Sequence, residues 1–333
     1  MRILMFGRGV IATVYGQAFQ TAGHDVEFYV RPGRSSGYGT ELRTDITDGR
    51  LKWGNQRVRQ VMNLTFRESL DPSDTFDIIV VSVGHHQLSQ AAEFLAPRIG
   101  RATVLVFGNI WEEPIAAVAP LPADQVVFGF PQAGGGFAED GVLHGALLGS
   151  VVIGRGEEPL SFRQLAVRAA FLQAGLRVRE ETDMRGWLFI HFIADAGMFA
   201  EGARGQALAG MIGDRRAFRR AFTIGRELLP LVRARGVDLR RHRTVLLPYR
   251  LSAVVAAAVA VATTRVAIAR ISLAAHTDRH PAEARAIIED TLREAARLAV
   301  PAPLLEAAVR ESWPAAIPTS SDSPREPRRP TSQ

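Results

Sequence analysis

Short runs of β-branched and aromatic residues alternate with longer amphipathic stretches over the first 180 residues of the chain. This alternation is typical of a parallel β-sheet whose strands are joined by covering helices. The sequence predicts strands at residues 3–6, 26–30, 78–82, 104–107, 126–130 and 151–153, a helix at 162–174 and a candidate last strand at 176–179. From Thr182 onward, Ala, Leu and Arg recur at helical spacing. The predicted fold class is α/β, with an N-terminal parallel-sheet domain followed by an all-helical C-terminal domain.

This change of pattern also predicts the domain organisation. Residues 1–180 form the sheet domain, residues 181–313 the helical domain, and residues 314–333, which are rich in Pro, Ser and Arg, a disordered tail. Within the helical domain, Pro248 is expected to interrupt or begin a helix. A helix stop with a capped restart is expected over residues 277–281.

Two apolar segments are candidates for a membrane or export signal, and neither has the required pattern. The first nine residues run into glycines after a short apolar stretch, which predicts a first strand and not a signal peptide. Residues 251–264 are rich in Ala and Val but are bounded by Arg250 and Arg265. Because a membrane span requires about 20 apolar residues, we predict a buried helix there. We expect a cytoplasmic protein without a membrane partner.

Composition narrows the possible chemistry. The chain has 333 residues and a net charge of +6; of its 40 basic residues one is Lys52 and the other 39 are arginine. Lysine-based mechanisms are therefore excluded away from position 52. The lack of cysteine excludes disulfides, thiolate nucleophiles and cysteine-based zinc sites. The sequence pI is near 10.5, but the arginines are scattered among Asp and Glu, so we expect no nucleic-acid partner.

A glycine-rich motif of the form G-x-G-x-x-[GA] follows the first predicted strand and opens a predicted helix. It consists of Gly7, Arg8, Gly9, Val10, Ile11 and Ala12. In a Rossmann-type domain such glycines permit a tight turn and a close approach of the backbone to a pyrophosphate, and the helix N-terminus offers free N–H donors. The motif predicts a dinucleotide site, the alternative being a glycine-rich turn without a ligand.

The end of the second predicted strand favours NADP as the cofactor. A free ribose 2′-hydroxyl is usually met there by Asp or Glu, whereas a 2′-phosphate requires cationic donors. This chain has no acid at the strand end but has Arg31, with Arg34 close behind. The alternative is that Arg31 is an ordinary surface arginine.

Together these segments resemble the ketopantoate reductases, which reduce 2-dehydropantoate with NADPH on a Rossmann domain joined to a helical domain. The matching segments are Gly7-x-Gly9, Ala22-Gly23-His24-x-Val26 with Arg31, Phe107-Gly108-Asn109, Asp140-Gly141 through Gly154, Trp187, and Ala299-Val300-Pro301. The resemblance implies that Asn109 lies beside the nicotinamide and the substrate. It also implies that Gln87 occupies the position of a family glutamine after the fourth strand.

The departures from this family are as informative as the matches. Counted from Trp187, the family's proton-donating lysine and two substrate asparagines fall on Phe189, Ile193 and Gly197, and a second family lysine falls on Gly84. None of these side chains can do that chemistry. The family's later glutamate and serine have no clear counterpart in residues 252–275. We therefore predict a substrate other than ketopantoate.

Histidine is then the best available proton donor. His191 lies on the same predicted helix as Trp187, and Asp195 follows four residues later on the same face, where it could orient His191 or raise its pKa. A buried structural His–Asp pair is the alternative. His85 and His86 follow the fourth strand at the edge where ligands bind, and one of them could replace the second lysine or have no role.

Three further features carry weaker predictions. Residues 132–137 follow the fifth strand as a flexible glycine loop that lets the backbone approach a substrate or merely bends. Arg265 and Arg270 interrupt an apolar helix, so either could clamp a substrate carboxylate or pair with an interdomain acid. His276 and His280 have helical spacing, but Pro281 and the missing carboxylate argue against a metal site.

The leading hypothesis is an NADP-dependent oxidoreductase that transfers hydride to a small carbonyl or imine substrate, with Asn109, His191 and Asp195 as catalytic residues. The alternative is a catalytically degenerate dinucleotide-binding protein, and a third possibility is ketopantoate reduction at a rebuilt site. If His191 or His85 points at the nicotinamide position, the chain is better explained as an enzyme. If the side chains of Phe189, Phe192 and Ile193 fill that position, it is better explained as a protein that only binds the dinucleotide. The long apolar helices are compatible with a homodimer.

Overall fold

The computed structural model describes residues 1–50, 56–156, 159–205, 207–274 and 282–312. Lys52, the predicted tail at 314–333 and the predicted helix stop at 277–281 lie outside the described residues. The same holds for His276 and His280.

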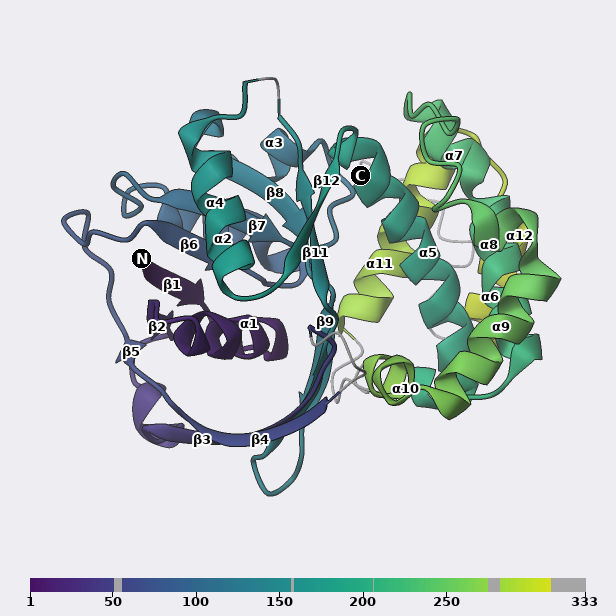
Figure 1. Cartoon of the computed structure of the whole chain (residues 1–333). Helices are drawn as coiled ribbons and strands as arrows, with labels where there is room; N and C mark the ends of the chain where they lie inside the picture. The colour runs from purple at the N-terminus through teal and green to yellow at the C-terminus, as the bar shows by residue number, and fades with distance from the viewer. Residues whose placement is uncertain (51–55, 157–158, 206, 275–281, 313–333) are drawn as a thin grey trace, which may run out of the picture.

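A large sheet of eight strands forms the N-terminal part of the molecule and confirms the predicted fold class (Figure 1). Its strands in spatial order are β12 (Arg177–Glu181), β11 (Ser150–Gly154), β8 (Val126–Phe130), β7 (Thr103–Phe107), β6 (Ile78–Val81), β1 (Arg2–Phe6), β2 (Asp25–Tyr29) and β5 (Phe66–Arg67). The pairs from β8 to β5 are parallel, β11 is antiparallel to β8, and β12 is parallel to β11. Every predicted strand is present within about two residues because long apolar runs flanked by turn residues are strong local signals.

The parallel pairing brings the carboxyl ends of β1, β2, β6, β7 and β8 to one edge of the sheet. Residues from widely separated parts of the sequence therefore meet there. The helices that connect or cover these strands are α1 (Val10–Thr21), α2 (Leu88–Leu95), α3 (Pro114–Ala117) and α4 (Phe162–Gln173). Helix α4 begins with a capping box between Ser161 and Gln164, as expected for a Ser-x-x-Gln start.

A second sheet, absent from the sequence prediction, lies on the other side of α1 (Figure 1). Its spatial order is β4 (Gln56–Asn63), β3 (Glu41–Asp48), β10 (Leu143–Leu147) and β9 (Ala133–Phe137). The prediction of a flexible glycine loop at 132–137 is wrong, because these glycines lie in strand β9. A Cβ atom on Gly135 would lie 2.6 Å from the His144 carbonyl oxygen and 2.9 Å from a Val10 side-chain carbon. The glycines thus allow close packing of strand on strand and helix.

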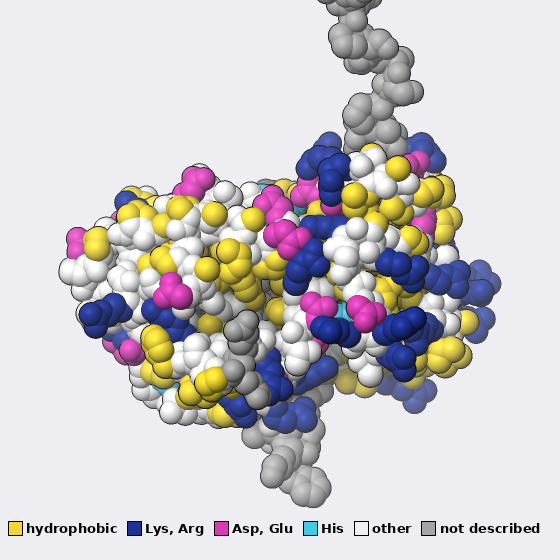
Figure 2. All heavy atoms as spheres, turned by 90° about the horizontal axis from the view of Figure 1, so that it is seen from above, with side chains coloured by type: hydrophobic (Ala, Val, Ile, Leu, Met, Phe, Trp, Pro, Cys, Tyr) yellow, Lys and Arg dark blue, Asp and Glu magenta, His cyan; other side chains and the backbone are white. Residues whose placement is uncertain are grey.

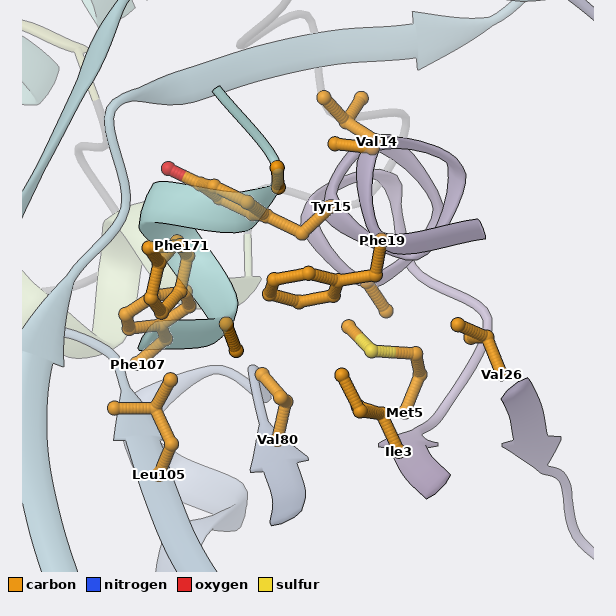
Figure 3. Close-up of a cluster of buried hydrophobic side chains, with 14 of the residues drawn as sticks. Ile3, Met5, Val14, Tyr15, Phe19, Val26, Val80, Leu105, Phe107 and Phe171 are labelled. Carbon is orange, nitrogen blue, oxygen red and sulfur yellow. The ribbon is translucent and has the colours of Figure 1, made fainter. Parts of the chain in front are cut away.

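Helix α1 is packed between the two sheets (Figure 3). Tyr15 and Phe19 point toward the large sheet and the aromatic ring of Phe171, whereas Val14 points away from them. Val14 contacts the second sheet, where a Cβ on Gly145 would lie 3.3 Å from it. The Tyr15 hydroxyl accepts a 2.9 Å hydrogen bond from the backbone N–H of Gln132, and burial raises the pKa of this tyrosine. This packing fixes the start of α1, where the glycine motif lies.

The C-terminal part is helical among the residues described beyond Glu181. Its α-helices are α5 (Met184–Arg204), α6 (Arg215–Glu227), α7 (Leu229–Ala234), α8 (Leu247–Arg250), α9 (Ser252–Arg265), α10 (Ala267–Ala274), α11 (Ala282–Arg297) and α12 (Pro303–Ser312). Pro248 lies in the first turn of α8, which confirms that it begins a helix. Helix α5 packs against α6, α11 and α12, and α10 reaches back to the second sheet. The domain boundary itself stays a prediction; the corresponding place in the structure is the turn between β12 and α5.

The Ala/Val-rich helix α9 is less buried than predicted. Only Ala256, Ala260 and Thr263 are buried, while Val254 is 67% and Val261 55% exposed. The prediction was wrong because an apolar composition does not show how many faces of a helix are covered. None of the described helices is long and apolar enough to cross a membrane.

Arginine side chains gather over the helical half of the molecule on the face in Figure 2, with acidic side chains among them. Along α11, Arg285, Arg293 and Arg297 pair with acids three or four residues away in the same helix. These surface cations are thus largely met by neighbouring carboxylates.

Candidate active site

The glycine motif has the geometry that a dinucleotide pyrophosphate requires. Gly7 has a φ of +103°, a conformation open to glycine, and a Cβ on Gly9 would meet nothing within 4 Å. No side chain caps α1 at Gly9, and the first helical bond runs from the Thr13 N–H to the Gly9 carbonyl at 2.9 Å. The N–H groups of residues 10–12 therefore have no partner within the helix. The residues fit a bound pyrophosphate.

Arg8 places a cation beside this turn. Its guanidinium lies 4.6 Å from the ring centre of Tyr38 and 4.7 Å from that of Phe137. Its Nε is buried without a hydrogen-bond partner among the described residues, and burial lowers the pKa of the guanidinium. Two aromatic rings thus hold the cation in place, and an anion bound at the motif would supply the missing partner.

The predicted 2′-phosphate partner, Arg31, is exposed directly after β2. The loop that follows is held by Glu68, whose carboxylate accepts hydrogen bonds from the N–H of Gly33 at 2.9 Å and of Ser35 at 2.8 Å. A hydrogen bond from the Ser35 side chain, together with these two backbone bonds, lowers the pKa of Glu68 to about 2. The sequence prediction missed Glu68 because the strand before it, β5, has only two residues.

One face of α5 lies at the edge of the large sheet and carries Trp187, His191 and Asp195 at intervals of four residues. The His191 ring stacks on Trp187 with centroids 5.0 Å apart and packs on Phe130, at the end of β8, with centroids 4.1 Å apart. His191 is thereby placed beside the carboxyl ends of the strands.

The positions reached by counting from Trp187 lie on the opposite side of α5. Phe189 and Ile193 are fully buried in the helical core, and a Cβ on Gly197 would lie 2.6 Å from the Ala221 carbonyl oxygen. Phe189 and Phe192 pack on Trp111, with centroid distances of 5.4 and 4.8 Å. These side chains therefore form the core and do not plug the cleft.

Asn109 and Asp195 are brought together across the two parts of the molecule. Asn109, two residues after β7, donates a 2.6 Å hydrogen bond from Nδ2 to Asp195 Oδ2. The other carboxylate oxygen of Asp195 lies 3.8 Å from Nε2 of His191, which is an ion-pair distance and too long for a hydrogen bond. The three predicted catalytic residues thus form one cluster. The Oδ1 atom of Asn109 is buried without a partner in the described part of the chain.

His85 forms a second link between the two parts. Its Nε2 lies 2.9 Å from Asp290 Oδ2 of α11, and its ring packs against Phe192. Burial raises the pKa of Asp290, but the bond to His85 and the charges of His85 and Arg293 outweigh it, so the pKa is lowered overall. His86 and Gln87 are exposed beside it. The structure gives His85 an interdomain contact; a contact of Gln87 with a cofactor stays a prediction.

A cavity of about 130 Å³ opens beside His191. Its lining comes from α5, α6, α8 and the segment before α8, and consists of Ile190, His191, Ala194, Met198, Ala221, Phe222, Val245, Pro248 and Tyr249. Burial, and to a smaller extent the charge of Asp195, raises the pKa of Tyr249. Tyr249 could not be predicted from the sequence, because only the packing of α8 with α5 and α6 around this cavity brings it there.

Part of this chain matches a known protein family, and known structures share its fold. Residues 3–158 match the family model described as ketopantoate reductase PanE/ApbA. These residues form a ketopantoate reductase domain. A search of curated proteins gives no significant match.

Solved structures share the fold of the ketopantoate reductase domain and of the helices after it. A 2-dehydropantoate 2-reductase from Geobacter metallireducens GS-15 is 17% identical with a TM-score of 0.65, over 95% of this chain and 100% of its own. D-mandelate dehydrogenase in complex with NADH is 13% identical with a TM-score of 0.67, over 94% and 97%. A dimeric ketopantoate reductase from Staphylococcus aureus is 14% identical with a TM-score of 0.59, over 92% and 96%. These likenesses cover the chain nearly from end to end.

The predicted clamp by Arg265 or Arg270 is not supported. Both side chains are exposed outside the ketopantoate reductase domain, and Arg270 donates to the Thr264 carbonyl at 3.2 Å. The prediction failed because the helices α9 and α10 are only partly covered. The arginine buried at the junction is instead Arg235, which stacks on Trp111 and Phe189 and lies 3.3 Å from Glu294.

Metal chemistry receives no support from the described residues, among which no group of three His, Asp or Glu side chains could hold an ion.

Proposed function

We propose that this chain is an NADP-dependent oxidoreductase that transfers hydride to a small carbonyl or imine compound. The observation that carries the proposal is the hydrogen bond between Asn109 and Asp195. It joins the carboxyl edge of the large sheet to α5, where Asp195 lies 3.8 Å from His191, a residue that lines a mostly apolar cavity. Clefts of this kind, with few convergent polar groups, are typical substrate sites.

The dinucleotide would lie along the edge of the large sheet. The N–H groups at the start of α1 and the Arg8 cation would hold its pyrophosphate, and Arg31 its 2′-phosphate. Its nicotinamide would lie near Asn109, whose buried Oδ1 has no hydrogen-bond partner among the described residues and could accept a bond from the cofactor. The bound cofactor supplies the hydride; the residues of this chain orient it and the substrate.

For a neutral carbonyl substrate, His191 is the proposed proton donor. A carbonyl oxygen that gains hydride becomes an alkoxide and needs a proton, and an imidazole supplies one near neutral pH. The carboxylate of Asp195, with an oxygen 3.8 Å from Nε2 of His191, would help to orient the imidazole.

A degenerate dinucleotide-binding protein is the second candidate. It is favoured by one observation: the face of α5 toward the sheet carries Trp187 stacked on His191, and the described residues include no lysine. In this case the protein binds NADPH but reduces nothing.

Two measurements distinguish the reductase from the degenerate protein. The first is a titration with NADPH, followed by NADPH fluorescence. The second is an assay of NADPH oxidation with keto acids, ketones, aldehydes and imines. Binding with oxidation supports the reductase, and binding alone supports the degenerate protein. Absence of NADPH binding would overturn both. We expect no rescue of a pantothenate auxotroph, and rescue would restore ketopantoate as the substrate.

We also propose that two copies of the chain associate as a homodimer. The support is the row of exposed apolar side chains on α8 and α9, namely Leu247, Leu251, Val254 and Val261. The Staphylococcus aureus neighbour is described as dimeric. Covering this row would remove apolar surface from water.

A further inference from the structure

The cavity beside His191 has a mostly apolar lining, which suits a hydrocarbon group. Of the nine described residues that line it, His191 and Tyr249 contribute polar side-chain groups and the other seven side chains are apolar. A cavity of roughly 150 Å³ with an apolar lining accepts a benzene ring. The present cavity, of about 130 Å³, is close to that size. It therefore suits a compact apolar body of one ring.

Asp195 lies between this cavity and the sheet edge. One of its carboxylate oxygens bonds to Asn109 on the sheet side, and the other faces His191 on the cavity side. Its charge also acts on Tyr249, on the far wall of the cavity. Asp195 itself is not among the described residues of the lining, but its side chain is 23% exposed and lies beside His191, which is, so a substrate that spans Asn109 and the cavity has this carboxylate close to it.

The charge of the site selects against anions. Among the described residues that line the cavity, the imidazole of His191 is the one group able to carry a positive charge, and none of these residues is a lysine or an arginine. A substrate carboxylate placed here would face Asp195 and be repelled, whereas a cation would be attracted.

Resting on the reductase function proposed above, we propose that the substrate is an iminium ion whose hydrocarbon body fills the cavity and whose cationic nitrogen pairs with Asp195. The iminium carbon gains a hydride, with its electron pair, from the reduced nicotinamide dinucleotide, which is oxidised. The π electron pair of the C=N bond becomes the nitrogen lone pair, and a neutral amine results. No proton is transferred, so this reaction requires no lysine.

Three probes of similar size and different charge test the substrate class. They are an N-methyl dihydroisoquinolinium ion, neutral tetralone and the anion phenylglyoxylate, each assayed for NADPH oxidation with the full chain. We expect kcat/KM to be at least about tenfold higher for the cation than for either other probe. A preference for tetralone or phenylglyoxylate overturns the iminium proposal and leaves the reductase standing. Bound NADPH with no oxidation by any of the three probes overturns the iminium proposal, and the wider panel described above then decides whether the reductase function stands.

A non-reactive cation gives a readout that is independent of turnover. Calorimetry with an N,N-dimethyl tetrahydroisoquinolinium ion should detect binding to the protein loaded with NADP. We expect Asp195→Asn, which keeps an oxygen for the bond from Asn109, to weaken this binding at least about tenfold, whereas NADPH affinity stays within about twofold. Asp124→Asn, the same change at a carboxylate that is 81% exposed and faces Arg163, should leave the cation's affinity unchanged. If the Asp195→Asn variant and the unchanged protein bind the cation with equal affinity, the proposal is overturned.

Discussion

At the scale of single residues, His191 and Asp195 are expected to matter for different classes of substrate. His191 is held between Trp187 and Phe130 and faces the cavity, whereas Asp195 is bonded to Asn109. A proton donor matters for a carbonyl substrate and not for an iminium ion, and a carboxylate matters most for a cation.

Replacement of His191 by Ala should therefore lower kcat for a neutral carbonyl by about 100-fold or more, the usual contribution of general acid catalysis. For an iminium substrate the same change should alter kcat less than about tenfold. NADPH affinity, measured by fluorescence, serves as the control and should stay nearly constant. An unchanged kcat for the carbonyl would remove His191 from the mechanism.

We expect Arg31 to decide the choice of dinucleotide, since it is exposed two residues after β2, where the 2′-phosphate would lie in the proposed site. Loss of a charged hydrogen bond of about 1.5–3 kcal/mol predicts a tenfold or greater loss of NADPH affinity in Arg31→Ala. NADH affinity should be unaffected. Arg34→Ala is the matched control; a larger effect there would reassign the phosphate contact.

At the scale of elements, α1 depends on the glycines of β9. The backbone of this strand approaches β10 and the first turn of α1 so closely that a side chain at Gly135 has no room. The strand thus supports the start of α1, which carries the glycine motif and the proposed pyrophosphate site.

Gly135→Ala should destabilise the fold by about 1–3 kcal/mol, as forced overpacking usually does. It should also weaken NADPH binding through the displaced start of α1. Gly37→Ala is the control, because nothing lies within 4 Å of a Cβ there. Urea unfolding of both variants measures the difference, and equal midpoints would contradict the close approach.

At the scale of the whole molecule, polar links close the cleft from both sides. Asn109 bonds to Asp195 of α5, and His85 bonds to Asp290 of α11. Both links pair a residue after a strand of the large sheet with a helical carboxylate. The cleft geometry therefore depends on carboxylates that acid protonates.

The pKa of Asp290 is lowered from its ordinary value of 3.8 in the folded protein, so its stabilising contribution is complete above that value and is lost as pH falls through the folded pKa. Asp290→Asn should be less stable than the unchanged protein at neutral pH and should lose less stability below pH 3.8. Unfolding midpoints against pH measure this. Asp124→Asn, whose side chain is 81% exposed, is the control and should follow the unchanged protein.

Association of two copies should depend on the apolar row on α9. Because Val254 is 67% exposed there, Val254→Glu should shift the protein from dimer to monomer in sedimentation velocity. Val61→Glu, at a position 56% exposed on β4, should leave the dimer intact. A dimer that persists in the Val254→Glu variant would place the interface elsewhere.

The sequence by itself determined the strands of the large sheet, the glycine motif and the lack of a lysine outside position 52, because these depend on residue type and short-range pattern. It also placed His191 and Asp195 four residues apart, which the regular helix preserves. Only the tertiary structure decided which face of α5 meets the sheet, and so why Trp187, His191 and Asp195, and not Phe189 and Ile193, line the cleft. It likewise decided the contacts of Glu68, Tyr249 and Asp290 and the exposure of α9. These depend on which distant segments pack together, and side-chain burial across such contacts is not encoded in local periodicity.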